Sequence, residues 1–266
     1  MKQYCKILTI AGSDSGGCAG IQADIKAISA CGCFAASAIT AITAQNTLGV
    51  AAVQQVQPDI VKAQIIAVLD DIGADAVKSG MLFSSDVIAA VAESLSNRRL
   101  RYVLDPVMVA TSGDLLLQND AVSSMTSMLF PLAEVITPNI PEALHLLESK
   151  EQIGTKEQMA DAAASLSKKF SVSVLLKGGH LTDDKSVDVL YSAATGGVDF
   201  FESPRINTPN THGTGCTLSA ALAAFAGKGL PLKDAVAQAK AYLGKAIASG
   251  AEYKTGEGHG PVNHFF

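Results

Sequence analysis

The chain has 266 residues, of which 48% are hydrophobic and 17% charged, and its net charge is −5. That length is sufficient for one large α/β core. The densest basic cluster, 98–101, is expected to be a solvated turn, and the chain has no Trp, so nucleic-acid binding is not expected. No apolar segment is long enough for a membrane span, and the N-terminal apolar run is too short for a secretory signal.

Five cysteines are present, at positions 5, 18, 31, 33 and 216. Their number is odd, their spacing is irregular and no C-x-x-C pair occurs, which argues against a disulfide framework or a zinc site. Cys31 and Cys33 have no His or Cys partner nearby in the sequence for a metal. The pattern fits a reducing compartment, and a cytoplasmic location is expected.

Short apolar, β-rich runs alternate with stretches of helical periodicity. In chain order the pattern predicts a strand, helix, strand and helix at 6–11, about 21–30, 36–43 and after residue 58. A strand at 74–78, a helix at 86–95 and strands at 102–104, 135–137 and 172–177 follow. This alternation predicts a mostly parallel central sheet covered by helices on both faces, a three-layer α/β/α sandwich.

A short β-rich stretch begins the C-terminal third of the chain. Segments 186–191 and 198–202 flank Thr195-Gly196-Gly197 and predict a small antiparallel hairpin that extends the sheet. No internal repeat, low-complexity segment or long linker separates any part of the chain. A single domain over 1–266 is therefore expected.

Polar residues gather just after the predicted strands, and ligands bind beyond the carboxyl ends of strands in open α/β sheets. They are Gly12-Ser13-Asp14, Gln45-Asn46, Lys78-Ser79, Asp105, Asn139 and Lys177. Because several separate segments deliver polar groups to one edge, the ligand site is expected there.

Gly213-Thr214-Gly215 stands immediately before a helical pattern in which Leu218, Leu222 and Phe225 share one apolar face. Main-chain N–H groups at such a helix start have no intrahelical partner, and the helix dipole adds positive charge. An oxyanion or phosphate is the expected occupant. The thiol of Cys216 lies beside this position, where its pKa is expected to fall, so the segment indicates phosphoryl transfer.

Two common nucleotide-binding motifs are absent from the chain. No G-x-x-x-x-G-K-[ST] segment occurs, which excludes a Walker P-loop. The glycine-rich turn at 12–20 lacks the G-x-G-x-x-G spacing, and no acidic residue ends the second strand. A dinucleotide-dependent dehydrogenase is therefore not expected.

Three further strand ends carry groups suited to phosphate chemistry. Asp105 supplies a carboxylate of the kind that Mg²⁺ prefers. Lys177 can act as a point charge on a transferring phosphate. Asn139, Pro141 and Glu142 also form a good helix start by capping alone, which is compatible with a second role in a site.

The run Thr211-His-Gly-Thr-Gly-Cys-Thr-Leu-Ser-Ala-Ala221 resembles the anion-hole segment of ribokinase-like small-molecule kinases, in the form typical of hydroxymethylpyrimidine phosphate kinases. Segment 12–24 is similar to the substrate segment of the pyrimidine and pyridoxal kinase branch. Asn139-Ile-Pro-Glu142 resembles the N-x-x-E signature of the superfamily, and 258–265 resembles the family's C-terminal stretch. The resemblance covers nearly the whole chain and implies a ribokinase-like fold.

The resemblance also implies roles for individual residues at the substrate end of the site. The main chain near Gly12 and the carboxylate of Asp24 would face the substrate hydroxymethyl group. The amide of Gln45 would read the ring amino group and ring nitrogen, since it offers a donor beside an acceptor. Met81 would pack on the pyrimidine ring, and Val107 belongs to the same substrate set.

At the phosphate end, the resemblance implies a binding set made of Asn139, Lys177, Thr211, His212, Gly213, Thr214 and Gly215. Asp105 and Glu142 would organise Mg²⁺. The catalytic set would be Cys216, Gly213, Gly215 and Lys177, with Cys216 taking or orienting the substrate proton. Sugar kinases of this fold usually carry Asp at that position, so the thiol favours the pyrimidine and pyridoxal branch.

The implied function is ATP-dependent phosphorylation of 4-amino-5-hydroxymethyl-2-methylpyrimidine and then of its monophosphate, for thiamine synthesis. A pyridoxine or pyridoxal kinase is one alternative, and a non-catalytic pyrimidine-binding regulator is another. The expected cofactors are ATP and Mg²⁺, and a need for a monovalent cation stays open. The expected partners are the pyrimidine, ATP and a second copy in a homodimer, with no nucleic acid and no membrane.

Overall fold

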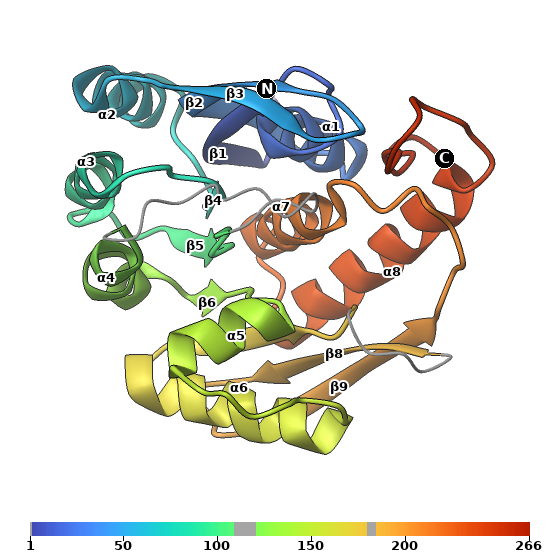
Figure 1. Ribbon diagram of the computed structural model, residues 1–266. Coiled ribbons are helices and arrows are strands. Elements are labelled where there is room, and N and C mark those ends of the chain that lie inside the picture. The colour runs from blue at the N-terminus through green and yellow to red at the C-terminus, as the bar shows by residue number, and fades with distance from the viewer. Residues whose placement is uncertain (1, 109–120, 180–184) are drawn as a thin grey trace.

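A computed structural model describes residues 2–108, 121–179 and 185–266 (Figure 1). Within them, nine strands form one sheet in the order β3-β2-β1-β4-β5-β6-β7-β8-β9. In chain order the strands are β1 (Lys6–Asp14), β2 (Phe34–Gln45), β3 (Val50–Gln55), β4 (Ala76–Ser79), β5 (Arg101–Leu104), β6 (Val135–Ile136), β7 (Ser173–Lys177), β8 (Lys185–Tyr191) and β9 (Val198–Pro204).

The six central strands, β2, β1, β4, β5, β6 and β7, are parallel to one another, and the antiparallel strands lie at the two edges. β3 pairs with β2 at one edge, and the predicted hairpin β8–β9 extends the other. β1 and β4 are neighbours, and the chain leaves β1 toward β2 on one side and β4 toward β5 on the other, so the direction of the connections reverses between them. Ligands bind in the crevice at such a switch point, beyond the carboxyl ends of the strands.

Helices cover both faces of the sheet, which confirms the predicted α/β/α sandwich (Figure 1). One face carries α1 (Gly20–Ala30), α7 (Thr214–Gly227) and α8 (Leu232–Gly250). The other face carries α2 (Pro58–Ala67), α3 (Ser85–Leu95), α4 (Ala121–Ser124), α5 (Ile140–Leu147) and α6 (Lys156–Phe170). Short π- and 3₁₀-turns follow α2 and α4 at Val68–Ile72, Met125–Leu129 and Phe130–Leu132. None of the described helices is long and apolar enough to cross a membrane.

α7 differs from the amphipathic helix that its sequence predicts. Nearly every residue from Thr217 to Ala226 is buried, polar Ser219 included, whereas Phe225 is only partly buried. The helix lies between α1, α8 and the sheet, so several of its faces meet protein (Figure 1). A helix that is buried all round has no polar stripe, and its many alanines allow this close packing.

β3 is a strand that the sequence pattern did not predict. It is an edge strand with no buried residue, and its sequence, which ends in two glutamines, shows no alternation of apolar and polar residues. Its pairing continues β2 to Gln45, two residues beyond the predicted end of that strand. The predicted glutamine is therefore held by strand pairing.

The C-terminal segment packs across the outer helices. His264 is buried and its Nε2 lies 3.0 Å from the hydroxyl of Thr217 on α7. Tyr242 on α8 donates to the main-chain carbonyl of the same histidine at 3.0 Å. Burial lowers the pKa of His264 to about 4, with a smaller contribution from Lys26. The ring is therefore neutral in the fold at neutral pH.

We predict that His264 makes the free energy of unfolding pH-dependent. In the unfolded chain this residue is protonated below its ordinary pKa of 6.5, whereas in the folded protein its pKa is about 4. The contribution of the neutral His264 to the free energy of unfolding is thus complete above pH 6.5 and is lost as the pH falls toward 4. At pH 5 the loss is about 2 kcal/mol. Urea unfolding at pH 7.5 and 5.0 should show a smaller pH effect in His264→Gln by about that amount. An equal effect in both proteins would contradict the assignment.

Candidate active site

A cavity of about 620 Å³ opens at the carboxyl ends of the parallel strands. Fourteen of the fifteen sequence-predicted site residues line it, and they come from β-strand ends and helix starts across the sheet. They are Gly12, Gln45, Met81, Asp105, Val107, Asn139, Glu142, Lys177, Thr211, His212, Gly213, Thr214, Gly215 and Cys216. The remaining residue, Asp24, does not line the cavity.

The N-terminus of α7 faces this cavity without a cap. Gly213 is the N-cap residue and provides no side-chain hydrogen bond. The main-chain N–H groups of Gly215 and Cys216 have no hydrogen-bond partner among the described residues. Unpaired amides at the positive end of a helix dipole form an anion site. A β-carbon built on Gly215 would lie 3.4 Å from Nζ of Lys177, which places a cation beside these amides.

The first βα-loop packs directly against this helix start. Gly213 has a φ of +80°, and a β-carbon there would lie 1.9 Å from the carbonyl oxygen of Cys18. Gly20 has a φ of +58°, and its main-chain N–H donates to the sulfur of Cys216. Only glycine combines these conformations with such a close approach of two backbones. The two loops thus form one wall of the cavity.

Lys177 and Asp105 meet across the cavity floor. Nζ of the lysine lies 2.7 Å from Oδ1 of the aspartate, which also accepts a 3.0 Å hydrogen bond from Thr137. Burial alone would raise the pKa of Asp105, but Lys177 and Lys78 outweigh it and hold that pKa below its ordinary value. Both groups therefore keep their charges. The amine has further hydrogens for a phosphate oxygen.

Asn139 and Glu142 form a capping box at the start of α5, as the sequence predicts. The Asn139 side chain accepts from the Glu142 N–H at 2.8 Å, and the Glu142 carboxylate accepts from the Asn139 N–H at 2.7 Å. The main chain of Met108 also donates to this carboxylate. Burial raises the pKa of Glu142 to about 7, against an opposing effect of Lys177.

The carboxylates of Asp105 and Glu142 are the hard oxygen donors that fit Mg²⁺. No group of three or more His, Cys, Asp or Glu side chains with metal-binding geometry occurs in the part of the chain that the structure describes. Mg²⁺ in phosphoryl-transfer sites uses one or two carboxylates together with waters and phosphate oxygens. The donor set is therefore suited to a metal that arrives with a nucleotide.

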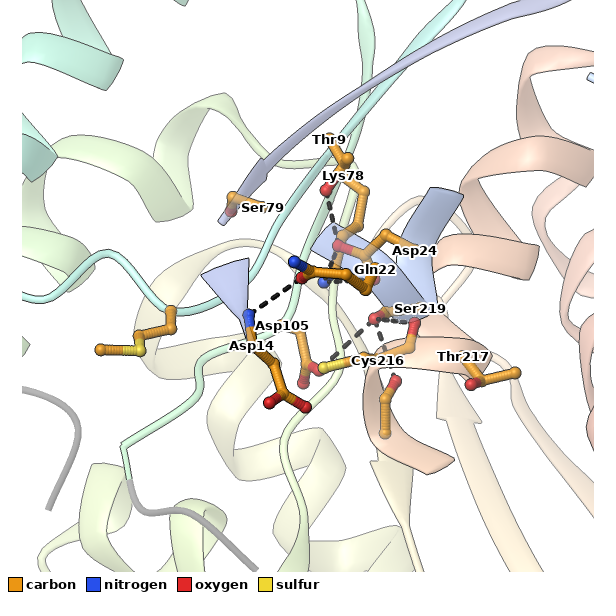
Figure 2. Close-up of polar contacts among 12 residues, drawn as sticks. Thr9, Asp14, Gln22, Asp24, Lys78, Ser79, Asp105, Cys216, Thr217 and Ser219 are labelled. Atoms are coloured by element: carbon orange, nitrogen blue, oxygen red, sulfur yellow. Dashed lines mark hydrogen bonds and ion pairs between the residues drawn. The ribbon is translucent and has the colours of Figure 1, made fainter. Parts of the chain in front are cut away.

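The resemblance places Asp24 at the substrate hydroxymethyl group, but Asp24 does not line the cavity. Its carboxylate is fully buried and pairs with Nζ of Lys78 at 2.8 Å, and Thr9 donates to it at 2.6 Å (Figure 2). Burial alone would lower the pKa of Lys78, but Asp24 raises it above its ordinary value. Asp24, on α1, therefore has no exposed surface for a ligand. Lys78 of β4 neutralises its charge inside the core.

The expected fall in the pKa of Cys216 is also wrong for the protein without ligands. Burial raises the pKa of this thiol to about 11, and the charge of Lys78 offsets only part of that effect. Asp24 and Asp105 are near enough to raise it further (Figure 2). Desolvation and two carboxylates therefore outweigh the helix dipole, and the group is a neutral thiol at physiological pH.

Gln45 also lines the cavity and belongs to a hydrogen-bonded group. Its Nε2 lies 2.9 Å from Nε2 of His212, and its Oε1 lies 3.1 Å from the hydroxyl of Thr43. Met81 lines the cavity beside Gly12, since its sulfur would lie 3.1 Å from a β-carbon built on that glycine. An amide beside a thioether suits a flat polar ring.

Several charged groups that line the cavity were not assigned from the sequence. Lys240 on α8 pairs with Asp188 on β8 at 2.7 Å, and Asp188 also accepts from the N–H of Gly178. The sequence offered one signal for this pair, because Lys240 lies next to Ala239 on the buried face of α8. Asp14, which accepts three main-chain hydrogen bonds from its own loop, was seen only as part of a polar cluster.

An anion cradle and a paired lysine at the switch point of a mainly parallel sheet define a small-molecule kinase of the ribokinase-like class. The comparisons with known proteins agree with this class. The chain belongs to the phosphomethylpyrimidine kinase family, whose model matches residues 14–263.

A hydroxymethylpyrimidine/phosphomethylpyrimidine kinase of Rhizobium meliloti (strain 1021) is 50% identical over 97% of this chain and 96% of its own length. The crystal structure of a phosphomethylpyrimidine kinase from Clostridium difficile 630 has a TM-score of 0.79 and 40% identity, and covers 91% of this chain and 99% of that one. An ADP complex of Bacillus subtilis pyridoxal kinase has a TM-score of 0.89 and 36% identity, with 98% of each chain covered.

We predict that Gly213→Ala abolishes the anion site. The added methyl group would overlap the Cys18 carbonyl and force the two loops apart, so kcat/KM should fall at least 100-fold, or about 3 kcal/mol in transition-state binding. Gly229→Ala is the matched control, since Gly229 has a φ of +88° but no atom within 4 Å. That variant should keep its activity. Equal kinetic losses in both would show that backbone strain alone is responsible.

We predict that alkylation of Cys216 is slow at neutral pH. Because the thiolate is the nucleophile and burial raises this pKa to about 11, the rate should still be rising above pH 9. Peptide-resolved mass spectrometry with iodoacetamide would give the rate for this residue alone. A plateau below pH 8 would restore the low-pKa thiolate that the sequence suggested.

Proposed function

We propose that this protein uses ATP to phosphorylate 4-amino-5-hydroxymethyl-2-methylpyrimidine and then its monophosphate, giving the pyrimidine pyrophosphate needed for thiamine. The observation that carries this proposal is the uncapped N-terminus of α7, where unpaired amides and Lys177 face the cavity. Membership of the phosphomethylpyrimidine kinase family and relatives named for both activities support the choice of substrate.

In this proposal the pyrimidine lies at the Gln45 end of the cavity. The Gln45 amide pairs with the ring amino group and the adjacent ring nitrogen, and Met81 packs on the ring face. The main chain at Gly12 and Val107 borders the same space. The hydroxymethyl group then points toward Cys216 and the start of α7.

The transfer itself forms a bond from the hydroxymethyl oxygen to the γ-phosphorus of ATP and breaks the bond from that phosphorus to the β–γ bridging oxygen. ADP leaves, and the neutral thiol of Cys216 orients the acceptor hydroxyl, whose proton passes to an oxygen of the transferred phosphate. Amides at Gly213–Gly215 and the charge of Lys177 stabilise the transferring group. In the second reaction, a phosphate oxygen of the monophosphate replaces the hydroxyl as acceptor. Positioning and charge neutralisation supply most of the rate.

The phosphates of ATP extend from α7 toward Asn139, Thr211 and Thr214, which line the cavity around the cradle. Asp105 and Glu142 would hold Mg²⁺, which would supply neutralisation of phosphate charge. In the absence of phosphate, Lys177 is engaged with Asp105. Nucleotide binding therefore offers that lysine a second anionic partner.

A pyridoxal kinase is the second candidate, because the Bacillus subtilis enzyme of that name has a TM-score of 0.89 with this chain. The experiment that decides is ADP formation by the purified protein with Mg-ATP and each alcohol in turn. A much higher kcat/KM for the hydroxymethylpyrimidine supports the proposal. A preference for pyridoxal would replace it with the second candidate, and no ADP from either alcohol would favour a non-catalytic binding protein.

We further propose a single kinase domain acting as a homodimer in the cytoplasm. One sheet runs through all the described parts of the chain, which supports the single domain. Apolar side chains at the β2–β3 side of the molecule, Ile42 and Leu48, are 54% and 69% exposed, and a second copy would cover them.

We predict that Gln45→Ala raises KM for the pyrimidine at least tenfold and changes KM for ATP by less than threefold. Loss of two hydrogen bonds to a substrate at about 1 kcal/mol each accounts for that size. Steady-state kinetics with each substrate varied in turn measures both constants. An unchanged KM for the pyrimidine would remove Gln45 from the substrate site.

A further inference from the structure

His212 contacts the substrate end of the cavity, although the sequence grouped it with the phosphate residues. Its ring is buried, 7% exposed, and lies 2.9 Å from Nε2 of Gln45. Its main chain is held by the C-terminal segment, since its N–H donates to the carbonyl of Gly260 at 3.0 Å. The loop before α7 and the C-terminal segment therefore fix this ring beside the amide that reads the pyrimidine.

The hydrogen bond between the two side chains has one direction in this structure. Nε2 of Gln45 can only donate, and it lies 2.9 Å from Nε2 of His212, so that ring nitrogen is the acceptor. A neutral imidazole carries one proton, which leaves the other ring nitrogen as the donor. Because the unprotonated nitrogen offers only a lone pair, the Gln45 amide keeps its NH₂ group toward His212.

With that orientation, the oxygen of Gln45 lies on the Thr43 side. The Thr43 hydroxyl is within 3.1 Å of this oxygen and 3.0 Å of the Ser13 carbonyl, so its single proton serves one of them at a time. One N–H and at least one oxygen lone pair of the amide remain for a ligand. His212 thus determines which side of the Gln45 amide presents the donor to the cavity and which presents the acceptor.

We propose that His212 is a positioning residue for substrate selection. By accepting a hydrogen bond from Gln45, it holds the amide so that donor and acceptor meet an amino group beside an unprotonated ring nitrogen in one order only. The inference rests on the proposed function and deepens it. A flipped amide would present an acceptor to the ring nitrogen and a donor to the amino group, and both contacts would be lost.

The protonation state of the ring tests this arrangement independently. Burial lowers the pKa of His212, the charge of His259 acts in the same direction, and Asp14 opposes them. The ring is thus neutral at neutral pH. Protonation in acid would make both nitrogens donors and would turn the Gln45 oxygen toward the ring.

The experiment measures KM for the hydroxymethylpyrimidine, KM for ATP and kcat in His212→Leu and His212→Gln at pH 7.5. The leucine variant, which lacks an acceptor, should raise KM for the pyrimidine about tenfold with ATP KM and kcat changed less than threefold. The glutamine variant keeps a carbonyl acceptor and should stay within threefold of the wild type. His145→Gln, at an exposed histidine of α5, is the matched control.

A double-mutant comparison separates positioning from direct contact. If His212 acts through Gln45, adding His212→Leu to Gln45→Leu should change KM for the pyrimidine by less than twofold. Multiplicative effects, or a loss confined to ATP KM or kcat, would overturn the proposal and return His212 to the phosphate site.

The pH dependence of KM tests the proposal even if the His212→Leu variant does not fold. The ratio of pyrimidine KM in His212→Gln to that in the wild type cancels the titration of the substrate itself. This ratio should fall as the pH is lowered from 7.5 into the range where His212 becomes protonated, because only the wild type loses its acceptor. A constant ratio would overturn the proposal, whereas absence of pyrimidine turnover in the wild type would instead overturn the proposed function.

Discussion

The site depends on a helix that starts inside the protein without satisfying its own amides. Three of the described helices, α3, α5 and α6, are capped by side chains, as α5 is by Asn139 and Glu142. α7 begins at Gly213 with no such cap, and the carbonyl of Cys18 occupies the space where a side chain would lie. The unpaired N–H groups can be satisfied only from the cavity. An anion bound there would accept hydrogen bonds from these amides, and it would therefore also stabilise the start of α7.

The charges below this helix are arranged as two ion pairs at different depths. The deeper pair, Lys78 and Asp24, is fully buried and keeps two opposite charges where neither could remain alone. The upper pair, Lys177 and Asp105, borders the cavity and can exchange partners with a ligand. Cys216 lies between these pairs and senses both through its raised pKa. The deep pair supports the site, and the upper pair belongs to it.

The C-terminal segment connects the two ends of the cavity. Near Gly260 it holds His212, and at His264 it contacts Thr217 inside α7. The same short segment therefore steadies the ring that contacts Gln45 and the helix whose unpaired amides face the cavity. Gly260 and His264 lie almost fifty positions from their partners His212 and Thr217. These long-range contacts explain why the tail packs closely although it forms almost no regular structure.

The sequence by itself determined the layered fold and most of the cavity wall. Strand–helix alternation requires a mainly parallel sheet, and polar residues after strands such as Asp105 and Lys177 must then meet at one edge. Local patterns could not show what lies opposite a side chain. Tertiary structure decided that Lys78 neutralises Asp24, that burial makes Cys216 a neutral thiol, and that His212 faces Gln45. Pairing, desolvation and hydrogen-bond direction depend on neighbours brought together from distant segments, and periodicity along the chain carries no information about them.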